Sequence, residues 1–250
     1  MMEKALQKFI SYWKQKDMVR GILLTGSYAV GIETKNSDVD IRLVLDDSTT
    51  GSFKGLETIE GFTFSFIGRS QSITLDKFNR QFFSHVKMEA RIYHIGKAIY
   101  DPYGEVAFLQ EIAKNYVETP LISKEVSETD CQLYMHSLYK KYEYIQNSNP
   151  KDPFYMYNYI LYLEKAISYY AEKLNAEMIY GNDSKLIRFL TDEKYIKTYG
   201  FPSFPDAKFK ALWLAALNKR EKSQLESIHI FLRKHLHNFN ESSTLIEWDN

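Results

Sequence analysis

Gly26-Ser27-Tyr28-Ala29-Val30-Gly31, followed shortly by Ser37-Asp38-Val39-Asp40, is the segment from which the architecture of this chain is best predicted. One apolar run of strand length, residues 19–25, precedes this segment, and another, residues 41–45, follows it. Apolar runs bounded by turn residues are typical of buried β-strands. The pattern therefore predicts a strand, a Gly-Ser turn, a short connection and a second strand that opens with two aspartates.

The two aspartates, Asp38 and Asp40, are separated by one residue. Residues i and i+2 of a strand project to the same face, so their backbones lie roughly 6 to 7 Å apart and their carboxylates can converge on one cation or on an adjacent pair. Magnesium prefers hard oxygen ligands and usually takes one or two carboxylates, which leaves positions for substrate phosphates. This spacing favours a metal site for phosphate chemistry.

Gly26 and Ser27 supply the second half of such a site. A glycine at the end of a strand lets the backbone approach a ligand closely, and the amides at the start of the next helix bind phosphate oxygens. Gly26 and Gly31 also imitate the glycines of a P-loop, but Ile32-Glu33 stand where Lys-Ser/Thr is required. A phosphate cradle that faces a carboxylate pair is what nucleotidyl transfer needs.

This order of motifs resembles the signature of the DNA polymerase β-like nucleotidyltransferase superfamily, in particular its small-molecule branch, which includes kanamycin nucleotidyltransferase. The likeness is carried by residues 19–46 and continues more weakly in the layout of the helical remainder. The resemblance implies that Gly26 and Ser27 bind the phosphates of a nucleoside triphosphate such as ATP. It also implies that Asp38 and Asp40 are the catalytic residues and hold Mg²⁺ or Mn²⁺.

One position departs from the family pattern, which usually adds a third carboxylate from a neighbouring strand. The best candidate strand is residues 61–67, whose alternation places three phenylalanines on one face and Thr63 and Ser65 on the other. Ser65 therefore stands where an acid is expected, and Glu57 and Glu60 are the nearby alternatives. We expect this change to weaken deprotonation of the acceptor more than nucleotide binding.

Each motif also has a purely structural interpretation. A Gly-Ser turn is often only a turn, and an Asp-x-Asp at a strand start is often a solvated edge. The combination, in this order between two apolar strands, favours function. Arg42 shares the strand face of Asp38 and Asp40, and we expect it to form a salt bridge with Asp40, with phosphate binding as the alternative.

The composition limits the classes of function. The chain has 250 residues with 32 basic and 32 acidic side chains, so no overall charge steers it toward long nucleic acids. The single cysteine, Cys131, excludes an internal disulfide and a cysteine metal cage. No apolar run reaches membrane-spanning length and the N-terminal pattern is charged and amphipathic. We expect no membrane association and a cytoplasmic location.

Glu118-Thr119-Pro120 interrupts the chain and predicts a boundary between two domains. We expect a nucleotidyltransferase domain over residues 1–119 and a helical bundle domain over residues 120–250. The expected helices of the bundle are residues 124–146, 153–176, 184–191, 206–217 and 222–239. The expected fold class is thus α+β, a small mixed β-sheet followed by an antiparallel α-helical bundle, with the site between the two. Relatives that dimerise across the bundle imply a homodimer.

The expected helix over residues 153–176 carries two sets of apolar side chains. Its helical spacing predicts a core stripe of Met156, Ile160, Leu163, Ile167, Ala171 and Leu174. The second set is Tyr155, Tyr159, Tyr162 and Tyr169. We interpret these tyrosines as amphipathic rings at a domain seam, with a stacking wall for an acceptor or a base as the alternative. The kanamycin-modifying relatives use a glutamate of the helical domain as base, which makes Glu164 a hypothesis.

The sequence thus favours a metal-dependent nucleotidyltransferase that moves a nucleoside monophosphate from an NTP to a hydroxyl of a small-molecule or protein acceptor. The alternative is a catalytically degenerate protein of the same fold that binds nucleotide or a partner protein, because Ser65 replaces the third carboxylate. A weaker alternative is an antitoxin-like domain, which would need a separate toxin partner.

Overall fold

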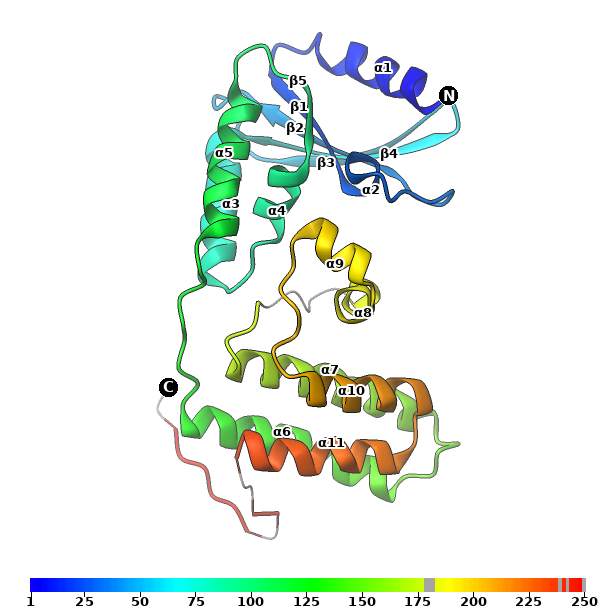
Figure 1. The fold of residues 1–250 in the computed structure, drawn as a ribbon, viewed down its shortest axis with the longest axis vertical. Helices are drawn as coiled ribbons and strands as arrows, with labels where there is room; N and C mark the ends of the chain where they lie inside the picture. The colour runs from blue at the N-terminus through cyan, green and yellow to red at the C-terminus, as the bar shows by residue number, and fades with distance from the viewer. Residues whose placement is uncertain (178–182, 238–239, 242, 249–250) are drawn as a thin grey trace. The chain divides into compact units, whose positions relative to one another are not determined.

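The computed structural model describes residues 1–177, 183–237, 240–241 and 243–248. The chain forms two compact units (Figure 1). The first unit comprises Met1–Ile122 and Lys197–Phe201, and the second comprises Ser123–Ile196 and Pro202–Asn250. The division into domains at residue 119 stays a prediction.

The first unit is built on a five-stranded sheet in the order β3-β4-β2-β1-β5 (Figure 1). Its strands are β1 (Val19–Thr25), β2 (Val39–Leu45), β3 (Phe53–Ile59), β4 (Phe62–Ser70) and β5 (Lys97–Tyr100). Strands β2 and β4 pair in parallel, and the other neighbouring strands pair antiparallel. The predicted mixed sheet is confirmed, as is the α+β class.

Five helices accompany the sheet, namely α1 (Met2–Trp13), α2 (Gly26–Val30), α3 (Gln71–Phe83), α4 (Met88–Ile95) and α5 (Glu105–Glu118). Helix α1 packs on one face, where Phe9 stacks on Phe64 with ring centroids 4.9 Å apart. On the other face, Leu23 and Val44 share a buried cluster with side chains of α3, α4 and α5. Alternation along each strand separates these two clusters, because successive side chains project to opposite faces.

Strands β3 and β4 are joined by a tight hairpin. Ile59 pairs with Phe62 across it, and Glu60 and Gly61 both have positive φ angles, 52° and 82°. Two such residues form the type I′ turn that suits a two-residue hairpin. Along β4 the phenylalanines Phe64 and Phe66 are buried and Ser65 between them is only half-buried, as the sequence alternation predicts.

The second unit is helical, with α6 (Glu128–Asn147), α7 (Pro153–Lys173), α8 (Asp183–Thr191), α10 (Ala207–Lys219) and α11 (Lys222–His235). Helix α9 (Glu193–Tyr199) begins in the second unit and ends in the first. Ser127 and Asp130 form a capping box at the start of α6. Helix α11 ends at His235, short of the predicted residue 239, which lies outside the described residues.

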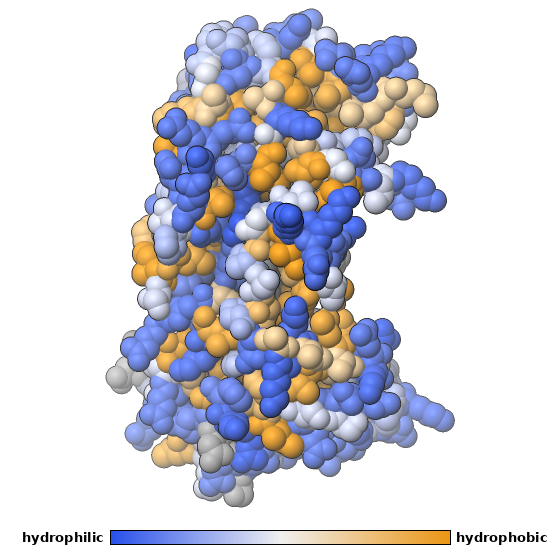
Figure 2. Space-filling model, in the orientation of Figure 1, coloured by the Kyte–Doolittle hydropathy of each residue, from blue (hydrophilic) through white to orange (hydrophobic). Residues whose placement is uncertain are grey.

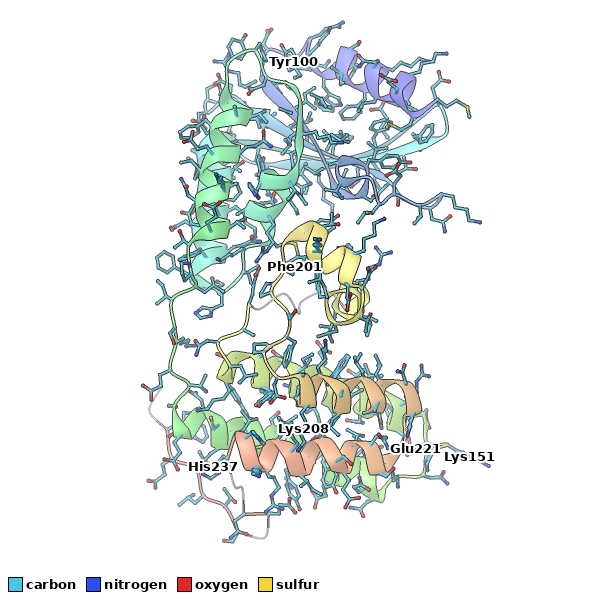
Figure 3. All side chains as sticks on the ribbon, in the orientation of Figure 1. Tyr100, Lys151, Phe201, Lys208, Glu221 and His237 are labelled. Carbon is cyan, nitrogen blue, oxygen red and sulfur yellow. The ribbon has the colours of Figure 1, made fainter. Side chains whose placement is uncertain are left out.

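At one end of the bundle, Lys222 at the start of α11 forms hydrogen bonds to the end of α6. Figure 3 places Lys151 in the connection between α6 and α7 and Glu221 in the connection between α10 and α11. The amine of the next residue, Lys222, donates to the carbonyls of Gln146 and Ser148 at distances of 2.7 and 2.8 Å. These carbonyls lie at the C-terminal end of α6, where no intrahelical donor remains for them.

The predicted core stripe of α7 is partly wrong. Met156 and Ile160 are 38% and 41% exposed, whereas Tyr155, Tyr159 and Tyr162 are buried. Leu163, Ile167 and Ala171 of the same stripe are buried as predicted, and they share their face of the helix with the tyrosines.

The phenol groups explain why tyrosines fill this face. The hydroxyl of Tyr159 donates to the carbonyl of Ala216 at 2.9 Å, and that of Tyr162 lies 3.1 Å from Nδ1 of His229. A buried phenol is stable once its hydroxyl has a partner, so tyrosine can occupy the core.

The surface is mixed in character. Hydrophilic and hydrophobic side chains are interspersed on the face shown in Figure 2. Among the described residues, no helix combines the length and the apolar composition that crossing a membrane requires.

Candidate functional site

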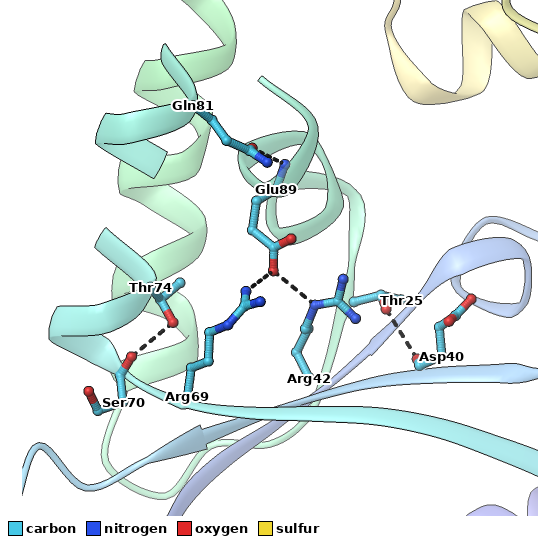
Figure 4. A network of polar contacts seen from close by, with 8 residues as sticks. All are labelled: Thr25, Asp40, Arg42, Arg69, Ser70, Thr74, Gln81 and Glu89. Carbon is cyan, nitrogen blue, oxygen red and sulfur yellow. Dashed lines mark hydrogen bonds and ion pairs between the residues drawn. The ribbon is translucent and has the colours of Figure 1, made fainter. Parts of the chain in front are cut away.

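The Gly-Ser turn lies directly against Asp40. Thr25, the last residue of β1, pairs with Asp40 near the start of β2, and its hydroxyl donates to the backbone carbonyl of Asp40 at 3.2 Å (Figure 4). Gly26 follows with a φ of +65°, and a Cβ built on it would lie 2.1 Å from Oδ2 of Asp40. Both the φ angle and the contact require glycine here. The structure therefore brings the turn and one of the two predicted acids together.

The other two predicted residues flank this contact. Asp38 is exposed and immediately precedes β2, while Asp40 is half-buried in the strand. Val39 between them is fully buried on the α1 side of the sheet, so Asp40, the next residue of the strand, projects from the opposite side. Ser27 is half-buried in the first turn of α2. The roles assigned to Gly26, Ser27, Asp38 and Asp40 stay predictions.

The position expected to carry a third acid holds a hydroxyl. Ser65 pairs with Asp40 across the parallel strands β2 and β4, so the two side chains project from one face of the sheet. Leu56 of β3 pairs with Ser65 and extends the same row. Among the residues that the structure describes, no group of three His, Cys, Asp or Glu side chains is placed to hold a metal ion.

Neither alternative glutamate takes the place of the missing acid. Glu57 pairs with Phe64, whose ring is buried under α1, and therefore projects away from Asp40. Glu60 lies in the hairpin turn and forms ion pairs with Lys4 and Lys8 of α1. The hydrogen bond from Lys8 lowers the pKa of the Glu60 carboxyl.

Arg42 binds a glutamate that sequence reasoning did not single out. Its Nε donates to Oε1 of Glu89 at 3.0 Å, and Nη1 of Arg69 donates to the same oxygen at 2.9 Å (Figure 4). Gln81 accepts a hydrogen bond from the backbone N–H of Glu89 at 2.8 Å. Arg42 forms an ion pair with Glu89 of α4, and its expected pairing with Asp40 stays a prediction. Arg42 and Arg69 lie on one face of two adjacent strands. Buried arginines need an acidic partner, so their positions could have indicated a buried glutamate or aspartate opposite them.

This ion network is largely buried, although the Arg69 side chain is 20% exposed. Arg42 and Glu89 are 9% and 6% exposed, and Tyr93, one helical turn after Glu89, is 1% exposed. Burial raises the pKa of the Tyr93 phenol to about 12. The phenol therefore stays neutral at physiological pH, and the charges in this part of the sheet are those of the two arginines and the glutamate.

The donor set at the turn fits a divalent cation of the magnesium type. The carboxylates of Asp38 and Asp40 and the hydroxyl of Ser65 offer hard oxygen atoms, which Mg²⁺ and Mn²⁺ prefer. The absence of a Cβ at Gly26 leaves room for the Asp40 carboxylate to lie against the backbone of the turn.

Glu164, the candidate base of the helical part, lies on the exposed side of α7. Leu163 beside it is buried in the bundle core. Its role as a base stays a prediction.

Part of the first unit matches a known family of domains. Residues 5–94 match the family model of the nucleotidyltransferase domain, a range that contains the turn, both aspartates, Ser65 and Glu89. Over these residues the chain is therefore similar to nucleotidyltransferase domains. Among solved structures, the chain is similar to a nucleotidyltransferase-like protein from Exiguobacterium sibiricum 255-15, with 12% identity and a TM-score of 0.42. That alignment covers 94% of this chain and 74% of the other. No functionally curated protein matches the sequence.

Proposed function

We propose that this protein is a metal-dependent nucleotidyltransferase that moves a nucleoside monophosphate from an NTP to a hydroxyl of a small-molecule or protein acceptor. The observation that carries the proposal is the contact between Gly26 and the Asp40 carboxylate, inside the segment that matches the family. A triphosphate held by the turn would lie beside the acid that binds its cation. The other features of the proposal are a cytoplasmic location and a homodimer, which sedimentation of the full chain would test.

The proposed reaction assigns a role to each of these residues. Asp38 and Asp40 would hold Mg²⁺ or Mn²⁺, and the backbone at Gly26 and Ser27 would orient the phosphates. The cation, when bound, neutralises charge on the triphosphate and on the attacking oxygen. The acceptor oxygen forms a bond to the α-phosphorus, the bond from that phosphorus to the bridging oxygen breaks, and pyrophosphate leaves. The proton of the acceptor hydroxyl passes to a base or to water, since Ser65 offers no carboxylate.

Pyrophosphate release tests the proposal. The full chain is incubated with each of four labelled NTPs, Mg²⁺ or Mn²⁺, and a panel of hydroxyl acceptors that includes aminoglycosides and proteins. We expect release with at least one combination and a loss of at least about a hundredfold for Asp40→Asn. Asp17→Asn, which changes an exposed aspartate before β1, is the matched control and should keep full activity.

A second candidate function is supported by the pairing of Ser65 with Asp40. In this alternative the protein binds nucleotide or a partner protein but does not transfer a nucleoside monophosphate, because the third carboxylate is missing. The variant Ser65→Asp separates the two candidates. Magnesium-dependent nucleotide binding without pyrophosphate release in the wild type, with release gained in Ser65→Asp, would favour the degenerate protein over the enzyme.

A further inference from the structure

One row of paired residues crosses the sheet of the first unit, from the Gly-Ser turn to an edge of the sheet. In this row Asp40 of β2 pairs with Thr25, the residue before Gly26, in β1. On its other side Asp40 pairs with Ser65 of β4, and Ser65 pairs with Leu56 of the edge strand β3. Neighbouring strands lie about 4.8 Å apart, so the row extends about 10 Å beyond Asp40 on the side away from the turn, a distance that a small molecule can span.

The face of β3 and β4 that carries this row is open. Leu56 is 74% exposed, whereas Phe64 and Phe66, which project from the opposite face, are buried in a cluster with side chains of α1. We use the term open face for side chains that alternation places on the side of Leu56 and that are exposed or half-buried, namely Lys54, Leu56, Thr58, Thr63, Ser65 and Ile67. None of these side chains is acidic, and Lys54 is basic. Glu57 of β3 projects from the opposite face.

The direction of the proposed transfer makes the open face the acceptor side. In phosphoryl transfer the attacking and leaving oxygens lie roughly in line on opposite sides of the phosphorus. The proposed function places the departing pyrophosphate at the turn, which lies on the β1 side of Asp40. The attacking hydroxyl must then approach from the β4 side of Asp40, over Ser65 and the rest of the open face.

We propose that the open face binds the acceptor, a small hydroxyl compound with an apolar part and an anionic group. Leu56 packs against the apolar part, and the amine of Lys54, two residues earlier on the same face, pairs with the anion. Thr58 and Thr63, which pair with each other across the two strands, offer hydrogen bonds to further hydroxyls. A polycationic acceptor, by contrast, would meet the charge of Lys54 and no carboxylate from this face. The inference rests on the proposed function and names the class of its substrate.

Steady-state kinetics of pyrophosphate release by the full chain, with an NTP, Mg²⁺ and a set of acceptor probes, tests this assignment. The probes are phenyl glucuronide, which is anionic, phenyl glucoside, which is neutral, kanamycin, which is polycationic, and serum albumin as a protein acceptor. We expect the highest kcat/KM with phenyl glucuronide. Lys54→Glu should raise the KM for phenyl glucuronide at least about tenfold, because the new charge repels the carboxylate, and should leave the KM for the NTP unchanged.

Two further substitutions on β3 sharpen the test. Leu56→Ala should raise the KM for both phenyl glycosides about tenfold, since it removes the apolar contact. The matched control is Glu57→Gln, which changes an exposed residue of the same strand on the opposite face and should keep the KM values of the wild type. The nuclear magnetic resonance signals of the leucine methyl groups give a readout without turnover. Phenyl glucuronide should shift the signals of Leu56 and leave those of Leu245, which is exposed in the second unit, unchanged.

The outcomes separate the two claims. Absence of pyrophosphate release with every acceptor would contradict the proposed function. Release that is most efficient with phenyl glucoside, kanamycin or serum albumin would overturn only the assignment of the acceptor. An unchanged acceptor KM in Lys54→Glu or Leu56→Ala would overturn it too, and so would Leu56 signals that do not respond to phenyl glucuronide.

Discussion

At the scale of single residues, the contact between Gly26 and Asp40 joins the backbone of the turn to the acid of the second strand. The positive φ angle of Gly26 disfavours a side chain, and its closeness to Oδ2 of Asp40 leaves no room for one. Gly31, at the end of α2, shares the positive φ angle of +71° but has no atom within 4 Å of its Cβ position. A substitution at Gly31 therefore tests the effect of the left-handed backbone alone. A substitution at Gly26 adds the effect of a side chain that collides with Asp40.

Gly26→Ala should therefore lower both stability and cation binding. The added methyl group would displace the Asp40 carboxylate, so we expect Mn²⁺ affinity to fall at least about tenfold. Gly31→Ala should cost only the left-handed backbone conformation, about 1 to 2 kcal/mol, and leave Mn²⁺ affinity unchanged. Urea denaturation together with Mn²⁺ titration measures both effects. Equal Mn²⁺ affinities in the two variants would contradict the importance of the contact.

We predict that His229 makes the stability of the second unit depend on pH. It is 2% exposed, stacks on Tyr142 with ring centroids 4.1 Å apart, and has Nε2 3.3 Å from Oε1 of Glu241. Burial lowers its pKa, and Glu241 opposes this only in part. The unfolded chain therefore takes up a proton first as the pH falls through the ordinary histidine range near about 6.5.

The free energy of unfolding should consequently be highest above that pH range, where His229 is neutral in both states. It should decrease as the pH falls toward 5. Urea denaturation at pH 7.5 and pH 5 measures this change in the free energy of unfolding. In His229→Gln the change should be smaller than in the wild type, because the titrating group is gone. His94→Gln, at an exposed position, is the control and should keep the wild-type pH dependence. An identical pH dependence in His229→Gln would show that the ring titrates normally.

At the scale of the element, α7 shows how polar partners decide which face of a helix is buried. Its sequence offers apolar or aromatic side chains on nearly every side, so periodicity alone did not distinguish Met156 and Ile160 from the tyrosines. The bundle provides carbonyls for Tyr159 and a histidine for Tyr162. The tyrosines therefore occupy the interior, and the thioether and the isoleucine remain at the surface.

Substitutions on the two faces of α7 should have unequal effects. Tyr159→Phe removes a buried hydroxyl from its carbonyl partners and should cost about 1 kcal/mol of unfolding free energy. Tyr159→Ala also removes a buried ring and should cost about 3 to 5 kcal/mol. Met156→Ala, on the exposed face, should stay within about 0.5 kcal/mol of wild type. Chemical denaturation tests all three, and a larger loss for Met156→Ala than for Tyr159→Ala would reverse this assignment of faces.

The elements that the sequence predicted well are those with local signals. The alternation along β4 depends only on neighbouring residues, and it was predicted correctly. Helix α9 was missed because it is short, although Asp192 supplies a capping signal by accepting from the backbone N–H of Tyr195 at 3.0 Å. Glu89 could not be placed, because its partner Arg42 is 47 residues away in the sequence and the pairing of β2 with β4 is not local.

At the scale of the whole molecule, the chain does not divide at one point. Residues Lys197–Phe201 belong to the first unit, although the sequence on both sides of them belongs to the second. Arg91 of α4 donates to the carbonyl of Gly200, and its guanidinium lies 4.8 Å from the ring centroid of Phe201. The predicted boundary depended on a proline-containing break, which reflects only the residues around it. The sequence therefore could not predict that Lys197–Phe201 belong to the first unit.

Phe201→Ala should therefore loosen an element that lies about a hundred residues earlier in the chain. Loss of the ring removes the cation–π contact with Arg91, which is worth about 1 to 2 kcal/mol when partly buried. Hydrogen exchange in α4 should become faster, while Phe154→Ala, at an exposed position of α7, should leave exchange there unchanged. Unchanged exchange in α4 for Phe201→Ala would show that Lys197–Phe201 does not stabilise the first unit.

Binding of a non-hydrolysable nucleoside triphosphate, followed by calorimetry, decides whether the turn and the acids act together on a nucleotide. The wild type should bind it in the presence of Mg²⁺, and affinity should fall at least about tenfold both in Asp40→Asn and when EDTA replaces Mg²⁺. Equal affinity under all three conditions, or no binding by the wild type for any of the four bases, would contradict the proposed site.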